Sequence, residues 1–137
     1  MKIAFTIPGD PIGAPRMTQR DKWQRRPCVL RYRDWKDKAR EAAGVLPPTE
    51  SIESVVIVAY FSPAASVSKK KRNAAYGTMH RVKPDADNIL KACLDALFGD
   101  DQKIAKCSIE KRWAIGERTE VEIEISEDNP YREQEIP

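Results

Sequence analysis

An eight-residue segment from Ser54 to Phe61, SVVIVAYF, is almost continuously apolar and is rich in β-branched residues. β-Branched and aromatic side chains favour extended strands, where they pack well on a pleated surface. A strand with one solvated face would alternate apolar and polar residues, and this segment does not. It is therefore predicted to be a strand that is buried on both faces.

Periodic patterns elsewhere predict the remaining regular elements. Patterns typical of strands occur at residues 2–7, 104–115 and 119–125. Apolar residues at helical spacing predict two helices, at residues 32–44 and 89–98. We expect residues 116–118 to form the turn of a hairpin that joins the last two strands.

These elements predict one α+β domain over residues 1–126, in which a mixed or antiparallel sheet packs with two main helices. Residues 127–137 follow as an acidic tail. The chain has 137 residues, 41% of them hydrophobic and 33% charged, as expected for a soluble protein with one modest core. No apolar run approaches the ~20 residues of a membrane span, and the first residues turn polar too soon for a signal peptide, so we expect a cytoplasmic protein.

The residues used in other catalytic and structural centres are sparse. The three cysteines are widely spaced and odd in number, which argues against a disulfide framework and against a zinc knuckle. Cys93 and Cys107 lie at apolar positions of their patterns, so we expect both to be buried, reduced thiols. His80 is the single histidine, and a lone histidine is more often structural than catalytic. The sequence has no P-loop and no plausible Ser-His-Asp or Cys-His set, so if the chain is an enzyme, acidic residues with a bound metal are the chemistry that it offers.

Positive charge is concentrated in residues 1–112, which carry 22 Lys and Arg against 13 Asp and Glu, while residues 113–137 carry 2 against 8. Such a basic surface attracts polyanions, of which nucleic acid is the commonest. Two predicted loops hold the candidate DNA-binding residues, which are Arg16, Arg20, Lys69, Lys70, Lys71 and Arg72. Trp23 lies in the first loop, where it can stack on a base or pack on the domain. The alternative for both loops is a solvated surface without a partner.

Acidic residues flank the predicted helix at 89–98, in the stretch KPDADNILKACLDALFGDDQ (residues 83–102). Pro84 keeps the residue before it out of helical geometry, so we expect an extended approach to the helix. In an extended segment Asp85 and Asp87 point the same way, about 7 Å apart, and the two carboxylates repel unless a cation lies between them. Mg²⁺ suits this place because it prefers oxygen ligands and often takes only one or two carboxylates. A helix N-cap would explain one of these aspartates but not the pair.

Other residues of this stretch have more than one interpretation. Lys91 lies four residues after Asp87 and four before Asp95, so it can form a helix ion pair or hold a phosphate oxygen beside a metal. Asp100 and Asp101 follow the helix, where, taken alone, they are better explained by a solvated turn.

The stretch resembles the RusA family of Holliday-junction resolvases, which are small phage and prophage endonucleases. The resemblance rests on K-P-D-A-D-N-I-L-K at residues 83–91, D-A-L at residues 95–97 and D-D-Q-K-I at residues 100–104. Weaker parallels, at the cation run 69–72, at His80 and in the loop at residues 9–16, extend it over most of the chain.

The resemblance implies a RusA-like fold and a homodimer that cuts two opposed strands of a four-way junction. It also implies that Asp85, Asp87 and Asp101 bind Mg²⁺, or Mn²⁺ in its place, and that Lys91 assists catalysis. The segment between Leu97 and Asp100 is shorter than in many relatives, and D-D-Q stands where D-D-x-Q is usual. Asp100 therefore stays an alternative to Asp101, which we prefer as the third ligand.

We therefore expect a Mg²⁺-dependent endonuclease that resolves Holliday junctions or other branched DNA in recombination and repair, in a bacterial or phage-infected cell. Two other classes remain open. The chain could be a non-catalytic phage DNA-binding protein with a structural metal site, or a protein–protein adaptor that uses its acidic tail.

Overall fold

A computed structural model describes residues 1–15 and 26–126 of the chain. Its strands are β1 (Lys2–Pro8), β2 (Ile52–Phe61), β3 (Cys107–Trp113) and β4 (Arg118–Ile125). Its α-helices are α1 (Pro27–Ala43), α2 (Lys69–Ala75) and α3 (Ala86–Leu97), and short 3-10 helices occur at η2 (Thr49–Ser51) and η3 (Asp101–Lys103). These elements form one small α+β domain with a mixed sheet, as the sequence predicts.

The four strands pair in the order β1-β4-β2-β3, with β4 antiparallel to both neighbours and β2 parallel to β3. The predicted hairpin between β3 and β4 is wrong, because β2 lies between them. Residues 114–117 connect the two strands across the end of β2, where Ala114 N donates to Phe61 O (2.8 Å) and Gly116 N to Ser62 Oγ (2.9 Å). Strands two places apart are separated by about 10 Å, a distance that four extended residues can span.

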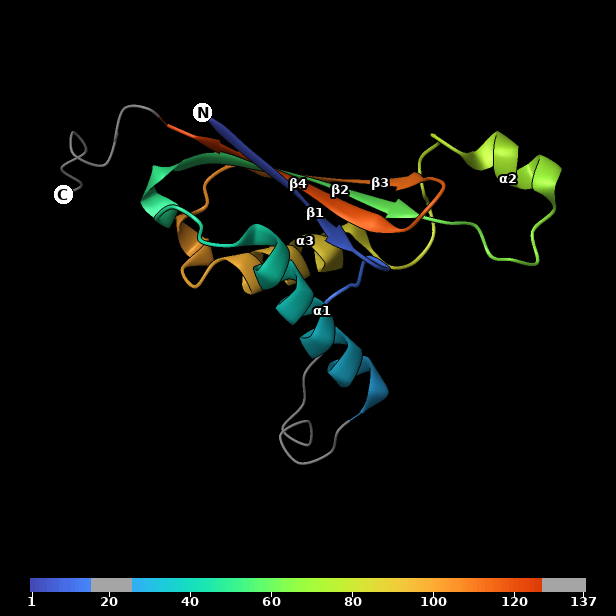
Figure 1. Cartoon of the computed structure of the whole chain (residues 1–137), viewed down its shortest axis with the longest axis horizontal. Helices are drawn as coiled ribbons and strands as arrows, with labels where there is room; N and C mark the ends of the chain where they lie inside the picture. Colours follow the sequence, from blue (N-terminus) through green and yellow to red (C-terminus); the bar gives the residue numbers. More distant parts are fainter. Residues whose placement is uncertain (16–25, 127–137) are drawn as a thin grey trace.

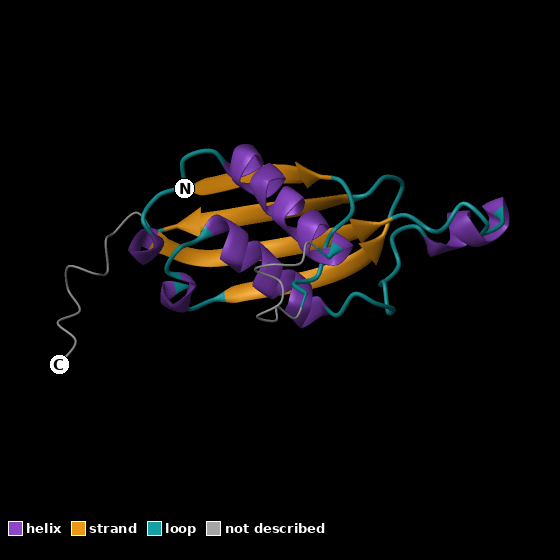
Figure 2. Cartoon of the chain, turned by 90° about the horizontal axis from the view of Figure 1, so that it is seen from below, coloured by secondary structure: helices purple, strands orange, loops and turns teal. Residues whose placement is uncertain are grey.

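Helices α1 and α3 cover one face of the sheet, and no helix of the described chain covers the other (Figures 1 and 2). The prediction that β2 is buried on both faces is therefore wrong. Val55 and Ile57 on the covered side are fully buried, whereas Val56 on the open side is 40% exposed. Because the open side of β2 also carries valines, its sequence hides the alternation that a one-sided strand normally shows.

Both large helices begin earlier than the sequence predicts. Helix α1 starts at Pro27, a residue whose fixed φ suits the first helical position, and buries Val29, Tyr32, Trp35 and Ala39. Helix α3 starts at Ala86 and buries Ile89, Ala92, Cys93 and Ala96, while Leu90, Leu94 and Leu97 are partly buried and pack against the core. The core therefore lies between these two helices and one face of the sheet.

The cation run at residues 69–72 belongs to helix α2 and not to a loop, which corrects the sequence prediction. Ser68 is its N-cap, and the hydroxyl of Ser68 accepts a hydrogen bond from Lys71 N (3.3 Å). The helix has no buried residue and extends beyond the end of the sheet, away from α1 (Figure 1). Helix α2 is therefore stabilised by local capping and not by packing against the core.

Of the two cysteines predicted to be buried, one is buried and the other is exposed. Cys93 is fully buried in α3, and burial raises the pKa of its thiol to about 12, so this thiol stays protonated. Cys107, which we expected to be buried, is exposed at the first position of β3. None of the helices in the described part of the chain is long and apolar enough to cross a membrane.

Candidate functional site

The predicted carboxylate pair lies at the N-terminal end of α3. Asp85 is the N-cap residue with an extended backbone (φ −68°, ψ 144°), and Asp87 lies in the first helical turn. The expectation of an extended segment through both residues is therefore wrong for Asp87. The Asp85 side chain makes no capping hydrogen bond, and both side chains are exposed. Two carboxylates thus remain free for a ligand at the positive end of the helix dipole.

The chain reaches this pair along the edge of β3. The backbone at residues 77–80 is hydrogen-bonded to β3 through Gly77 N to Trp113 O (2.8 Å), Trp113 N to Thr78 O (3.0 Å) and His80 N to Lys111 O (3.0 Å). The approach to α3 is therefore fixed to the sheet as far as His80.

His80 is 5% exposed and lies between two aromatic rings. It stacks on Phe61, with a centroid distance of 4.0 Å, and is tilted against Trp113, with a centroid distance of 4.3 Å. Its Nδ1 atom has no hydrogen-bond partner among the described residues. Burial, with a contribution from the positive charge of Lys111, lowers the pKa of His80 below its ordinary value. A neutral, enclosed imidazole that closes the end of the core agrees with the structural role predicted for it.

The loop at residues 9–15 packs against the start of α3 from the other side. Ala14 N donates to Asn88 O (3.0 Å), and a Cβ atom on Gly13 would lie 3.2 Å from the Cβ atoms of both Pro84 and Asn88. The described part of this loop, which ends at residue 15, therefore passes close to the carboxylate pair. Arg16, Arg20 and Trp23 lie outside the described residues, as does the predicted acidic tail at 127–137.

A groove of about 670 Å³ runs beside Asp85 and combines positive charge with this carboxylate. Its lining residues are His80, Arg81, Val82, Lys83, Asp85, Ala86 and Lys111. Three of these side chains are cationic, and lysine and arginine are the usual ligands of phosphate oxygens. The surroundings of Asp85 therefore suit a polyanion that approaches a metal ion.

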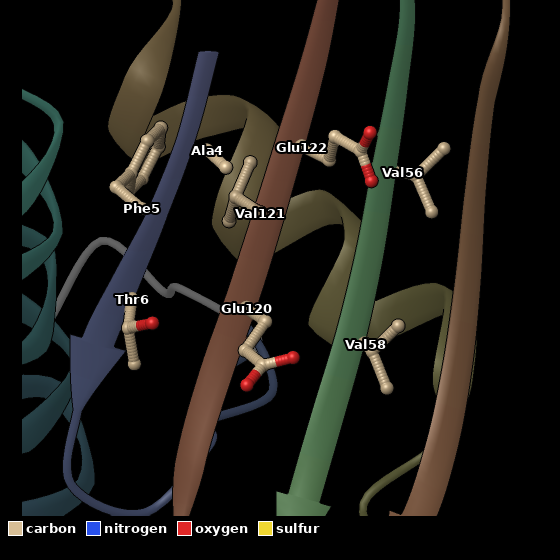
Figure 3. Close-up of a pocket in the computed structure, with 8 residues that line it drawn as sticks. All are labelled: Ala4, Phe5, Thr6, Val56, Val58, Glu120, Val121 and Glu122. Carbon is tan, nitrogen blue, oxygen red and sulfur yellow. The ribbon is translucent and has the colours of Figure 1, made fainter. Parts of the chain in front are cut away.

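The open face of the sheet has the opposite character. A shallow hollow of about 340 Å³ there is lined by Val56 and Val58 of β2 beside Glu120 and Glu122 of the neighbouring strand β4 (Figure 3). The two glutamates pair with Arg118 (3.0 Å) and Lys2 (3.1 Å), respectively. Because each carboxylate offsets a cation, this face offers a phosphate backbone less positive charge than the groove beside Asp85.

Asp101 begins η3, which follows the C-terminal end of α3, whereas the carboxylate pair lies at the N-terminal end of that helix. Helix α3 has 12 residues, which correspond to a length of about 18 Å. The two ends of α3 also have different neighbours. Near Asp101, Lys103 Nζ binds Glu50 Oε1 (2.6 Å), which lies just before β2. Near the carboxylate pair, Lys111 Nζ of β3 binds Pro84 O (2.7 Å). No three ligating side chains of the described residues are grouped closely enough to hold a metal ion. One chain therefore does not bring the three predicted ligands together.

The two neighbouring aspartates after α3 differ in their surroundings. The side chain of Asp100 is 58% exposed and lies 3.7 Å from Lys103 Nζ, whereas Asp101 is half-buried at the start of η3. The preference for Asp101 as a metal ligand stays a prediction.

The predicted cationic residues differ in whether their charged groups are exposed or bound within the protein. Lys91 is exposed on α3 and forms no salt bridge with Asp87 or Asp95 in the described part of the chain, so its ammonium is available. Lys69, Lys70 and Lys71 are exposed on α2. The Arg72 guanidinium instead donates to Val67 O (3.1 Å) and Ala64 O (2.9 Å), which closes the turn before α2.

The sequence prediction missed Lys111, which lines the groove and donates hydrogen bonds to the segment before Asp85. A signal was present in the sequence. In a strand, alternate residues share a face, so Lys111 lies on the same side as Ile109 and Trp113. A lysine in the apolar register of a strand indicates a specific partner, because a buried ammonium needs one.

Comparison with known proteins identifies the family but no individual relative. A search of curated proteins gives no match. The family model of endodeoxyribonuclease RusA matches residues 8–124, which include the carboxylate pair, Asp101, α2 and all of β3. A match over this much of the chain shows that the protein belongs to the RusA family of endodeoxyribonucleases.

Proposed function

We propose that this nuclease is a Mg²⁺-dependent enzyme that resolves Holliday junctions or related branched DNA during recombination and repair. The observation that carries the proposal is the exposed carboxylate pair, Asp85 and Asp87, beside a cationic groove. A nuclease must bring a polyanion close to acidic residues, and a metal ion between them offsets the repulsion. The charge pattern around α3 supports this arrangement.

The residues at the start of α3 fit a hard cation, because the candidate donors Asp85 and Asp87 offer oxygen atoms alone. Bound there, Mg²⁺ would supply Lewis-acid chemistry and a water of lowered pKa. Arg81 and Lys83 would hold the phosphates that flank the scissile bond. Lys91 lies one helical turn beyond Asp87 and would stabilise the negative charge that develops on the phosphate.

We propose further that Asp101 of one chain completes the site of a second copy. This rests on the separation of Asp101 from the carboxylate pair by the length of α3. A two-fold homodimer contains the same contact twice, so it would hold two equivalent sites. Two sites suit a substrate in which two opposed strands are cut.

The replacement Asp87→Asn tests the metal role, because it removes one carboxylate charge and preserves the side chain's size. We expect the variant to lose cleavage of a synthetic four-way junction in Mg²⁺ while its affinity for the junction in EDTA is retained or increased. The matched control is Asp95→Asn, which makes the same change on the same helix at a residue that accepts a hydrogen bond from Tyr32 (3.4 Å). Wild-type cleavage by Asp87→Asn would exclude Asp87 as a metal ligand.

The distance between Asp101 and the pair also favours one competitor, a DNA-binding protein whose carboxylates hold a structural metal ion. If the wild-type protein cleaves a four-way junction in Mg²⁺ and does not cleave it in EDTA, this alternative is excluded. Binding without product in Mg²⁺ would support it.

A further inference from the structure

Lys111 occupies a position in β3 where the fold otherwise places apolar side chains. It pairs in register with Ala59, which is fully buried on the covered face of β2. The neighbouring pairs on this face are Ile57 with Ile109 and Phe61 with Trp113. Lys111 is partly buried, and an ammonium group that loses part of its contact with water needs acceptors in the protein.

The acceptors are two backbone carbonyls of the segment that enters α3. Lys111 Nζ lies 2.6 Å from Val82 O and 2.7 Å from Pro84 O. Hydrogen bonds from a charged donor are shorter and stronger than those between neutral groups. Pro84 directly precedes Asp85, so the lysine holds the backbone on which this carboxylate is mounted.

No other hydrogen bond in the described chain ties residues 81–84 to the sheet. The backbone bonds to β3 end at His80, and the next tie is the one between Ala14 and Asn88 inside α3. The Asp85 side chain has no capping hydrogen bond of its own to fix its direction. Its placement therefore depends on its backbone, which α3 holds on one side through Ile89 N to Asp85 O (3.2 Å) and Lys111 holds on the other side through Pro84 O (2.7 Å).

We propose that Lys111 is a positioning residue: it fixes the backbone at Val82 and Pro84 and thereby places the Asp85 carboxylate for metal binding. The proposal rests on the function proposed above, in which Asp85 is a metal ligand. Outer residues that orient a metal ligand typically change metal affinity by about 10- to 100-fold when they are replaced. A merely structural lysine would instead affect folding without changing the Mg²⁺ dependence of the folded enzyme.

The test compares Lys111→Met with wild type in four-way junction cleavage over a Mg²⁺ titration of the full chain. Methionine keeps much of the length and removes the charge and all three donors. We expect the half-saturating Mg²⁺ concentration to rise at least about 10-fold, with the rate recovering as Mg²⁺ increases. Junction affinity in EDTA should stay within about twofold of wild type, because that interaction needs no metal.

Two variants control for charge and for folding. Lys106→Met removes an exposed lysine just before the same strand and should leave the Mg²⁺ dependence unchanged. Lys111→Arg keeps a charged donor of two hydrogen bonds and should restore most of the Mg²⁺ affinity. Lys111→Gln serves if Lys111→Met does not fold, because it retains a donor but not the charge, and we expect it to lie between Lys111→Arg and Lys111→Met.

Two results would overturn the inference. One is a folded Lys111→Met or Lys111→Gln enzyme with the wild-type Mg²⁺ dependence. The other is a rate that falls equally at every Mg²⁺ concentration. Asp85→Asn in the same assay shows whether only the role of Lys111 is wrong or whether the proposed metal role of Asp85 is wrong as well. Wild-type cleavage by Asp85→Asn overturns the metal role itself, whereas inactive Asp85→Asn beside an unaffected Lys111→Met overturns the role of Lys111 alone.

Discussion

Gly13 is the point where the loop before α1 touches α3 with no room for a side chain. An added Cβ atom would lie 3.2 Å from the Cβ atoms of Pro84 and Asn88, closer than most such contacts. We expect Gly13→Ala to lower the free energy of unfolding by about 1–3 kcal/mol, the usual cost of overpacking. Urea denaturation measures this change. Gly99→Ala is the control, because a Cβ there meets nothing within 4 Å, and an equal loss in both variants would contradict the steric account.

His80 gives the fold a specific dependence on pH. Because its pKa is lowered in the folded protein, the unfolded chain binds the proton more readily as pH falls below the ordinary value of about 6.5. The contribution of neutral His80 to stability is therefore complete above that pH and is lost below it. It is the only histidine, so His80→Phe should remove this part of the pH dependence.

The check is the urea midpoint of wild type and His80→Phe at pH 7.5 and at pH 5.5. We expect the wild type to lose more stability than the variant on acidification. Parallel losses in the two proteins would show that the histidine does not cause the change.

At the scale of elements, the cation run of helix α2 combines three exposed lysines with one arginine that supports the local structure. Lys69, Lys70 and Lys71 are exposed, while Arg72 closes the preceding turn through two carbonyls. Replacing the three lysines with glutamine, which has a similar helix propensity, should weaken junction binding. The slope of log K against log salt should fall by about 0.9 for each phosphate that the variant no longer neutralises.

Arg72→Gln provides the comparison for that prediction. We expect it to loosen the turn at residues 64–68 and to reduce the helical signal of α2. Gel-shift titrations at several salt concentrations measure the affinity of the triple variant and of Arg72→Gln for the junction, and the salt dependence of each affinity. An unchanged salt slope in the triple variant would exclude α2 from the DNA interface.

The sequence predicts elements whose signals are local, and it fails where pairing is decided at long range. The spacing of Tyr32, Trp35 and Ala39 predicts α1, and the carboxylate pair is recognisable in one short motif. The position of β2 between β3 and β4 depends on strand pairing that no local pattern reports. For Lys111 the sequence offered only an anomaly, since its partners lie 27 and 29 residues away.

At the scale of the whole molecule, charge is divided between its faces. Helix α2 lies beyond the end of the sheet near which α3 begins (Figure 1). This helix carries the exposed lysines, and the cationic groove lies beside the start of α3. Glu120 and Glu122 occupy the open face of the sheet (Figure 3). Nucleic acid should therefore approach the start of α3, where the carboxylate pair lies, and the open face should stay free of it.

The proposal that two copies of the chain together form each metal site also concerns the whole molecule, because it depends on the position of Asp101. A single chain holds Asp85 and Asp87 at one end of α3 and Asp101 beyond the other. Two copies are needed if all three are to bind one metal ion. Activity then becomes a property of the dimer, and inactive chains with complementary defects can repair one another.

The most direct measurement is the nicking of a four-way junction by co-expressed Asp87→Asn and Asp101→Asn chains. Each variant alone should be inactive. In a mixed dimer one site carries both substitutions, while the other combines an intact Asp85 and Asp87 with an intact Asp101, so we predict that the mixture nicks the junction in Mg²⁺. A mixture that forms dimers yet stays as inactive as its components, or wild-type cleavage by either variant alone, would contradict the account.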